Sequence, residues 1–573
     1  MRRRRAGLRL MGGATMTEST TASPGAHPGI PHHGHGGLKR SVGFWGLMFV
    51  SLGSIIGSGW LLGALFAAQS AGPASMLSWV LAAVMLMSLA LIHAELGSAY
   101  PVAGGTARFP YFAFGALAGF AAGWVGWLQA VVIAPIEVEA SIAYINSTDW
   151  SKQHFDMLNG NGTLNARGLI VASIAMLVFL VINMLGAQFF ANLNGFFVVL
   201  KTAVPLLTIV ALPFISFHSG NFTAGGGFAP HGAHGIFAAL PLGVVFALQG
   251  FEQAVQMSGE SRNPRRDVSR AVITAMCIGT AIYLLLEFVY IGAINPKDVA
   301  NNWNNPSGAG DFGPYYTIAL AAGATWLSVI LLSDAVVSPA DTGLIFMATT
   351  ARLGYAVSED DALPEPLTRV NKSGIPVYSL LLAFVVGELV FLPFPSWGKL
   401  VGVVTAATAI MYAFAPVSLA ALQHRDPDRP HPYRMPMPKL LNPLGFISAN
   451  LIIYWSGFDA TWKLLTLILV GRLLFEVKLH TTDSLSRDDV DWHAASWIWP
   501  WLIGMTVLGV LGRYGDGSHS TLPEWWDLAA VVLFSLAIFY YAIGHAMSLE
   551  HIEESVAVDE EQMRMPDPVA LPG

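Results

Sequence analysis

The sequence predicts an all-α polytopic membrane protein with about fourteen transmembrane helices, and three observations predict it. Of the 573 residues, 54% are hydrophobic and only 12% are charged, whereas soluble globular proteins carry about 25% charged residues. Apolar stretches long enough to cross a bilayer recur along most of the chain. Lys and Arg gather in alternate connections between these stretches.

The apolar stretches follow one another from residue 43 to residue 547. The predicted spans are 43–69, 75–99, 111–145, 167–187, 194–216, 235–257, 269–294, 316–350, 376–394, 398–422, 440–457, 460–477, 495–512 and 526–547. Because their number is even, both termini are expected on the same side of the membrane.

The distribution of Lys and Arg gives these spans a direction. With the N-terminus inside, 23 of the 30 basic residues lie in inside segments, six lie in outside segments, and Lys201 lies within a span. Cytoplasmic loops of membrane proteins carry such an excess of Lys and Arg. The sequence therefore predicts a multi-pass protein of the plasma (inner) membrane with both termini in the cytoplasm.

Composition divides the chain into four regions. Residues 1–40 combine Arg with Ser, Thr, Pro, Gly and His, which is typical of a disordered cytoplasmic tail. We expect a ten-helix core at 41–425, four additional transmembrane helices at 426–548, and a cytoplasmic C-terminal tail at 549–573. These four additional helices are candidates for packing against the core or for a homodimer interface.

Several function classes are excluded at this stage. The net charge of −7 argues against a nucleic-acid partner, because phosphate binding needs clustered basic residues. A single cysteine, Cys277, excludes an intramolecular disulfide and a cysteine metal cluster. We find no His pair with metal-ligand spacing and no serine nucleophile elbow, so we expect neither a cofactor nor an enzyme.

The first span carries an interruption near its middle, GSIIGSGW at 53–60. Each glycine costs a helix about 1 kcal/mol relative to alanine, so three in seven residues favour an unwound turn. Close helix packing of the small-xxx-small kind, from Gly53 to Gly57, is the alternative. Irregular backbone at membrane depth survives only where it is buried or lines a cavity.

The sixth span carries a second interruption, FALQGFEQ at 246–253, and its Glu252 needs a cavity or a partner. Broken helices in matching positions of two halves are a sequence indication of a transporter's binding site. A broken helix exposes free N–H groups at one end, which attract a carboxylate, and free carbonyls at the other, which attract an ammonium. An α-amino acid carries both groups, so it is the substrate class that the two breaks favour.

The motifs resemble those of the amino acid–polyamine–organocation (APC) transporters. The resemblance rests on GSIIGSGW (53–60), AELG (94–97), GESRNPRRD (259–267), ARLGYA (351–356) and GIPV (374–377), and it covers residues 40–425. LSDA (332–335), LPFPSW (392–397) and YWSG (454–457) are most similar to the bacterial aspartate–proton symporter branch. The resemblance implies a leucine-transporter-like core of five-plus-five inverted repeats, with discontinuous helices 1 and 6. It further implies alternating access and uptake of L-aspartate, with glutamate less favoured, the proton being the coupling ion.

The two breaks and the resemblance together define candidate substrate-binding residues. We expect the α-carboxylate at the first break and the α-ammonium at the carbonyls near Phe246 to Gln249, with Phe251 as an aromatic lid by resemblance. The Gln249 amide is a candidate partner of a side-chain carboxylate, and Phe346 is a further candidate for lining the pocket. The full candidate set is Ile56, Gly57, Ser58, Gly59, Phe246, Leu248, Gln249, Gly250, Phe251 and Thr342.

Lys201 is the candidate proton-coupling residue. The resemblance places its amine where sodium-coupled relatives hold a sodium ion, and burial disfavours the charged form of a lysine. A lysine that changes its protonation could take a proton outside and release it inside. Snorkelling to the interface is the alternative, and either Asp334 or Asp341 could be its partner. A carboxylate at position 341 departs from the aspartate-symporter pattern and would repel an acidic substrate.

Glu95 and Glu260, near the cytoplasmic face, are candidates for gating, although such charges also serve as topology determinants. The sequence assigns no role to four further acids within spans, Glu137, Glu139, Glu287 and Glu388. It also leaves open another amino acid or a polyamine as substrate, exchange in place of symport, and a sensor that does not transport.

Overall fold

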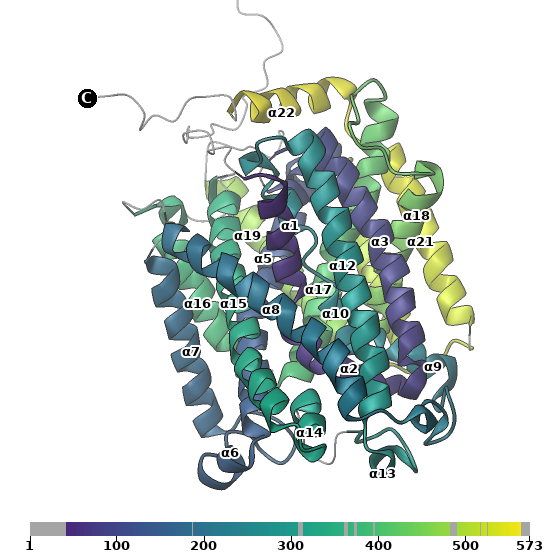
Figure 1. The fold of residues 1–573 in the computed structure, drawn as a ribbon. Coiled ribbons are helices and arrows are strands. Elements are labelled where there is room, and N and C mark those ends of the chain that lie inside the picture. Colours follow the sequence, from purple (N-terminus) through teal and green to yellow (C-terminus); the bar gives the residue numbers. More distant parts are fainter. Residues whose placement is uncertain are drawn as a thin grey trace, which may run out of the picture.

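The computed structural model describes residues 42–102, 104–185, 187–306, 313–359, 365–371, 375–393, 396–481, 490–515, 517–523 and 525–562. The predicted tail at 1–40 lies outside these described residues. Within them, every regular element is a helix, and β-pairing is limited to three isolated bridges. Figure 1 shows the helices gathered into one bundle. The predicted all-α fold is confirmed.

The long helices follow the predicted spans. The first five spans correspond to α1 (Phe44–Ile55) with α2 (Ser58–Ala71), α3 (Ser75–Ala99), α4 (Gly105–Phe114) with α5 (Ala116–Asn146), α7 (Ala166–Met184) and α8 (Ala187–Ile215). The sixth span is divided into four short elements: α9 (Gly232–Ala238), η3 (Leu240–Val244), α10 (Val245–Ala247) and α11 (Gln253–Gln256). Spans seven to ten are α12 (Pro264–Ala293), α14 (Pro314–Ala321) with α15 (Thr325–Glu359), α16 (Val377–Val390) and α17 (Trp397–Arg425). The last four are α18 (Pro438–Trp455), α19 (Gly457–Thr481), α20 (Ile498–Leu511) and α21 (Trp526–Gly544). The short helices α6 (Asp149–His154) and α13 (Pro296–Val299) lie between spans, and α22 (Leu549–Gln562) follows the last one.

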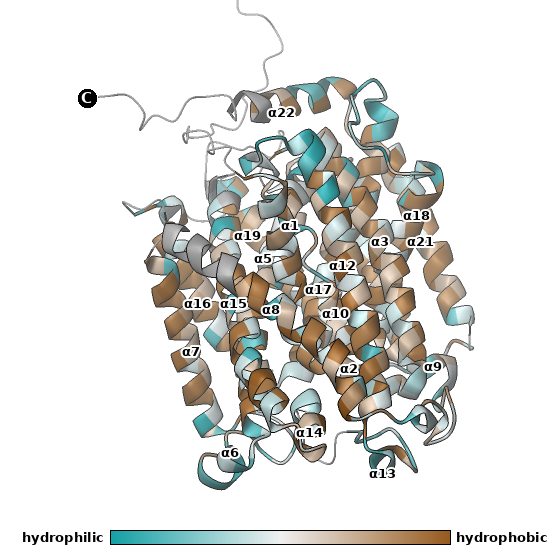
Figure 2. Cartoon of the chain, viewed as in Figure 1, coloured by the Kyte–Doolittle hydropathy of each residue, from teal (hydrophilic) through white to brown (hydrophobic). Residues whose placement is uncertain are grey.

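Eight helical stretches in the described part of the chain are long and apolar enough to cross a membrane, and four shorter apolar helices accompany them. Figure 2 shows hydrophobic residues along the length of these helices and hydrophilic ones concentrated at the two ends of the bundle. Such a distribution is expected where lipid surrounds the middle of the bundle. The chain is a multi-pass membrane protein.

Burial separates inner helices from outer ones. In the most apolar window of α17, 94% of the residues are buried, and in that of α5, 89%. In α7, in the stretch Phe197–Ile215 of α8, and in α21 the share is only 33%. Polar side chains on α5 and α17 therefore face protein rather than lipid.

The first span is broken between α1 and α2. Ile56 (φ −89°, ψ 88°) and Gly57 (φ −126°, ψ −144°) leave the helical region, so the chain stops one helix and starts another at mid-span. Gly59, in the first turn of α2, lies close to the backbone of the sixth span, since a β-carbon there would lie 2.7 Å from Ala247 Cα. The predicted unwound turn is present, and a continuous helix at 53–59 is excluded.

The sixth span is interrupted twice. Leu242 and Gly243 leave the helical region inside η3, and residues 248–252 form no helix between α10 and α11. Gly250 has φ 109°, a conformation that side chains disfavour, and a β-carbon there would lie 2.7 Å from Ser54 Cβ. The two breaks thus pack against each other, and they lie five spans apart as the five-plus-five repeat requires.

Three of the last four spans, α18, α20 and α21, are joined by buried polar contacts. Asn450 of α18 accepts from Trp501 Nε1 of α20 at 2.7 Å and donates to Ser535 of α21 at 3.0 Å. Tyr454 of α18 donates to Asp527 of α21 at 2.8 Å. Part of the predicted C-terminal tail forms the helix α22, which lies across one end of the bundle (Figure 1).

Candidate functional site

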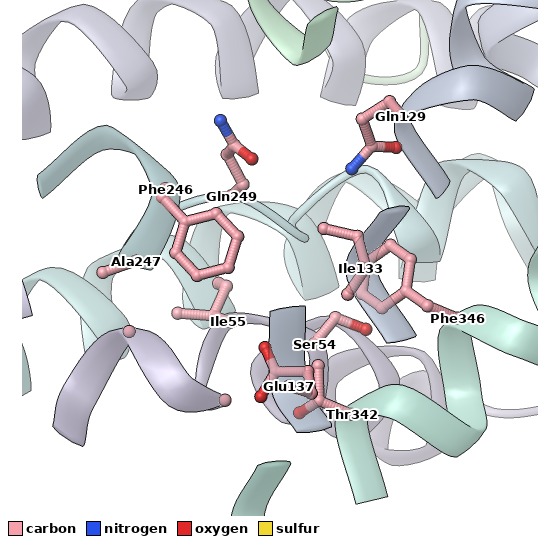
Figure 3. Close-up of a pocket in the computed structure, with 12 residues that line it drawn as sticks. Ser54, Ile55, Gln129, Ile133, Glu137, Phe246, Ala247, Gln249, Thr342 and Phe346 are labelled. Atoms are coloured by element: carbon pink, nitrogen blue, oxygen red, sulfur yellow. The ribbon is translucent and has the colours of Figure 1, made fainter. Parts of the chain in front are cut away.

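A small pocket lined by buried residues lies where the two broken spans meet. It is lined by α1–α2, α5, the sixth span and α15 through Ser54, Ile55, Gly57, Gly59, Gln129, Ile133, Glu137, Phe246, Ala247, Gln249, Thr342 and Phe346 (Figure 3). Of the candidate substrate-binding residues, Gly57, Gly59, Phe246, Gln249 and Thr342 line this pocket, as does Phe346. The breaks therefore enclose one shared cavity.

The bare N-terminus of α2 holds a carboxylate that belongs to the chain itself. The backbone N–H of Ser58 donates to Glu137 Oε2 at 2.7 Å, and Ser58 Oγ donates to Glu137 Oε1 at 3.0 Å. Trp397 Nε1 donates in turn to Ser58 Oγ at 2.9 Å. Helix N-termini favour anions through free N–H groups and the helix dipole. The sequence assigned no role to Glu137, whose partner lies 79 residues away.

The carbonyls at the C-terminal end of α1 are partly occupied by side chains. Tyr283 of α12 donates to the Ile55 carbonyl at 2.8 Å. Thr342 Oγ1 lies 3.4 Å from the carbonyl oxygens of both Gly53 and Ile56. In the sixth span, the Phe246 carbonyl accepts the Gln249 N–H at 3.2 Å. A carbonyl oxygen has two lone pairs, and the Ile55 carbonyl also accepts the Gly57 N–H at 3.2 Å. Among these acceptors, the Gly53 carbonyl, whose described donor is Thr342, therefore retains capacity for an ammonium group.

Lys201 is fully buried, which excludes snorkelling. Its Nζ lies 2.9 Å from Asp341 Oδ2 and donates to Thr342 Oγ1 at 2.9 Å. Of the two candidate partners, the structure selects Asp341. Asp334 is also buried, and among the described residues no ion pair joins it to Lys201. Lys201 therefore reaches the α1–α2 break through Thr342.

Glu252 stabilises the unwound part of the sixth span. Its carboxylate accepts the Gly250 N–H at 3.0 Å and the Tyr412 hydroxyl of α17 at 2.5 Å. The expectation that this acid needs a partner is confirmed.

The expected position of Phe251 needs correction. The ring centroid of Phe251 lies 4.9 Å from that of Tyr412 and 5.5 Å from that of His93. Phe251 therefore packs on these two rings and does not line the pocket. The chain passes through the positive φ of Gly250 just before Phe251. The aromatic side chains that line the pocket are those of Phe246 and Phe346. Three further candidates, Ile56, Leu248 and Gly250, shape the breaks without lining the pocket, and Ser58 contributes through Glu137.

Sequence reasoning missed the contribution of α5. Gln129, Ile133 and Glu137 are spaced by four residues, which places them on one helix face, and all three line the pocket. Glu139 lies two residues on, and its buried carboxylate has no hydrogen-bond partner among the described residues. The four-residue spacing was available in the sequence, but nothing in it indicated which face of α5 meets the breaks.

The two candidate gating residues have different surroundings. Glu95 accepts from the Met435 N–H at 2.9 Å and from Gln423 Nε2 at 2.6 Å, and His431 Nδ1 lies 2.8 Å from Glu95 Oε1. Burial and the nearby Glu95 charge raise the pKa of Tyr433 in the same loop. Glu95 thus binds α17 and the loop between α17 and α18.

Glu260 contributes mainly through its backbone. Its carbonyl accepts the Val42 N–H at 3.0 Å, and the Arg262 N–H donates to the Val42 carbonyl at 2.9 Å. The segment before α1 is therefore paired with the loop that follows α11.

Two broken spans around one buried pocket in a polytopic helical bundle define a membrane permease with a broken-helix binding site. The family described as "Amino acid permease" matches residues 42–474. The chain belongs to this family: it is an amino acid transporter and not an enzyme.

Relatives whose names state a substrate match 77–91% of this chain. The glutamate/serine transporter AimA of Bacillus subtilis (strain 168) is 33% identical over 527 residues, 91% of this chain and 97% of its own length. The aspartate-proton symporter of the same organism is 33% identical over 515 residues, 88% of this chain and 96% of its own length. The branched-chain amino acid permease BcaP is 26% identical over 465 residues, 77% of this chain and 93% of its own length.

Proposed function

We propose that this permease takes up an acidic amino acid together with a proton by alternating access, with aspartate favoured over glutamate. The observation that carries the proposal is the buried pair of Lys201 and Asp341 beside the α1–α2 break. Intramembrane ionisable groups are costly and mark ion or substrate pathways in transporters. A proton can be exchanged at such a pair without any bound cofactor.

The substrate's two charged groups are proposed to use the two ends of the broken helices. The α-carboxylate takes the N–H groups at Gly57 to Gly59, where a carboxylate is already bound at Ser58. The α-ammonium takes carbonyl oxygens at the end of α1 and in the segment of Phe246. These assignments follow from the helix dipoles, which point positive at an N-terminus and negative at a C-terminus.

Lys201 is proposed to report its protonation to the binding site through Thr342. When the Lys201 amine loses its proton, it also loses its positive charge and one hydrogen-bond donor. Asp341 Oδ2 and Thr342 Oγ1, which each accept from Lys201 Nζ at 2.9 Å, are the groups affected. Thr342 in turn contacts the Gly53 and Ile56 carbonyls. A proton delivered to the pair would therefore change the hydrogen bonding of the first break.

The negative charge of an acidic substrate favours coupling of its uptake to a proton. An anionic substrate entering an inside-negative cell works against about 2.3 kcal/mol per charge per 100 mV, and a proton moving with it offsets this cost. Two relatives of equal identity bear names that include an acidic amino acid, one of them as a proton symporter.

Uptake of labelled L-aspartate into proteoliposomes, with and without an inward proton gradient, tests the proposal. Wild-type uptake should rise with the gradient, and Lys201→Ala should lose this response while retaining exchange of internal for external substrate. Uptake that ignores the gradient would end the symport proposal, and full coupling in Lys201→Ala would end the role of Lys201.

Competition by unlabelled compounds resolves the substrate. Glutamate, serine, alanine, leucine and putrescine are added in excess, and the proposal expects glutamate alone to compete strongly. Dominant competition by a neutral amino acid or by putrescine would replace aspartate as substrate. Binding without any uptake would indicate a sensor.

A further inference from the structure

The Glu137 carboxylate occupies the place that an amino acid's α-carboxylate requires. It is 1% exposed and accepts both donors that Ser58 offers at the start of α2. These bonds join a side chain of α5 to a broken helix, so the site is built from two separate spans. The chain thus carries its own ligand for the anion site at the break.

There is no room for a second carboxylate while Glu137 stays. A β-carbon at Gly57 would lie 2.9 Å from Glu137 Oε1, so this oxygen packs directly against the break. Two ionised carboxylates sharing one site repel each other strongly, and one of them becomes protonated. A substrate carboxylate must therefore compete with Glu137 for the Ser58 N–H.

We propose that Glu137 is an internal competitor of the substrate's α-carboxylate and gives up the Ser58 N–H when it takes up a proton. The inference rests on the proposed amino acid site but not on the acidic side chain of the substrate. It places a second proton site in the pocket, distinct from Lys201.

The exchange balances in charge. In the empty site, one carboxylate, that of Glu137, faces the α2 N-terminus. When substrate binds, one proton joins Glu137 to give a neutral carboxyl group, and the substrate carboxylate accepts the Ser58 N–H in its place. When substrate leaves, Glu137 releases the proton and accepts both Ser58 donors again. One proton thus accompanies each substrate α-carboxylate that binds at Ser58.

Other ionisable groups surround Glu137. Lys201 of α8 and Tyr283 of α12 are close enough to interact electrostatically with it. Asp341 of α15 neutralises Lys201 through their ion pair, and Asp334 lies seven residues earlier on the same helix. The experiment therefore has to separate a proton on Glu137 from one on the Lys201 pair.

Equilibrium binding of labelled L-aspartate, L-glutamate, L-serine and L-alanine to the purified full-length protein between pH 5 and 9 provides the test. Protonation of Glu137 is favoured as the pH falls, so wild-type affinity should weaken as the pH rises, approaching about tenfold per pH unit. Glu137→Gln keeps the shape of the side chain but cannot ionise. Its affinity should stay constant over this range at the wild-type low-pH value.

Glu139→Gln is the matched control. It changes a buried glutamate of the same helix, two residues away, that lies outside the pocket. It should keep the wild-type pH dependence. A Glu137→Gln protein that retains this dependence, with the tenfold slope intact, would overturn the inference and place the linked proton elsewhere.

A second measurement keeps the inference testable if Glu137→Gln does not fold. Proton uptake on substrate binding is measured in weakly buffered solution for Asp341→Asn, in which Lys201 has lost its carboxylate partner. About one proton per bound substrate is expected at pH 8, and no proton uptake would overturn the inference. A wild type that binds none of the four probes would refute the proposed function itself, whereas pH-independent binding would refute only the role of Glu137.

Discussion

Lys201 of α8 and Asp341 of α15 meet at 2.9 Å in a buried ion pair, 140 residues apart in the sequence. Neither side chain is more than 1% exposed. In this pair the positive charge of Lys201 and the negative charge of Asp341 compensate each other, so no unpaired charge is buried there. Thr342 connects the pair to the α1–α2 break. Protonation or deprotonation of this pair can therefore affect the backbone that is proposed to bind substrate.

Breaking this pair should cost stability as well as coupling. Removal of one partner of a buried ion pair typically costs about 3–5 kcal/mol, because the other charge stays buried and unpaired. Lys201→Ala should therefore lower the melting temperature markedly, and Lys201→Met combined with Asp341→Asn should restore much of it. Thermal unfolding in detergent measures both, and a single variant as stable as wild type would contradict the importance of the pair.

Gly59 should not tolerate a methyl group. A β-carbon there would lie 2.7 Å from the backbone Cα of Ala247, so the two broken spans would have to separate. We expect Gly59→Ala to reduce uptake by at least about tenfold, which corresponds to about 1.4 kcal/mol.

Gly402→Ala is the control for this prediction. Gly402 lies in α17, and no atom of a neighbouring element lies within 4 Å of the position that a β-carbon would take there, so alanine should be neutral or stabilising. Uptake by both variants is compared at equal expression. Full activity in Gly59→Ala would mean that the two breaks do not need this contact.

The amide end of the pocket should govern side-chain selectivity. In the view of Figure 3, Gln129 and Gln249 both lie on the side of the pocket opposite Glu137 and Thr342. The Nε2 atoms of both amides are buried and have no partner among the described residues. Gln129→Leu should weaken competition by aspartate about tenfold or more, since a site built to hydrogen-bond discriminates strongly, while alanine should compete as before. Equal effects on both competitors would show that Gln129 does not contact the side chain.

The two candidate gating acids should respond differently to neutralisation. The two oxygens of Glu95 accept from the Met435 N–H and from Gln423 Nε2, and Glu95→Gln replaces one of them by an NH2 donor. One of the two bonds is lost, so we expect a loss of about 1–3 kcal/mol in unfolding free energy. Glu260→Gln should be nearly neutral, because the contacts described for Glu260 use its backbone. Chemical unfolding and substrate counterflow are measured together. Faster counterflow with unchanged KM in Glu95→Gln would support a gate, whereas unchanged counterflow would leave Glu95 with a structural role.

Much of the fold followed from the sequence because the bilayer restricts what a chain can do. Spans are predicted from apolar length, and the break at Gly57 is predicted from three glycines within seven residues at mid-span. For Lys201, the position within an apolar stretch left burial and snorkelling open, and the structure shows burial. The spans and the break depend on local properties, and the structure places both as expected.

The contents of the pocket could not be predicted in the same way. Asp334 and Asp341 look alike in the sequence, and only the packing of α8 against α15 selects Asp341. Phe246 and Phe251 flank the same break, and of these two only Phe246 lines the pocket. Nothing near Glu137 in the chain indicates that it binds the start of α2.

The sequence by itself determined that this is a membrane-embedded helical bundle with two interrupted spans, since desolvation of the peptide backbone acts on each span separately. Only the tertiary structure decided which charges meet and which carboxylate fills the anion site. Those pairings depend on how each helix is rotated about its own axis. Successive residues of a helix are about 100° apart, so rotating a helix by one residue position gives its side chains new partners. The apolar length that identifies the span in the sequence stays the same.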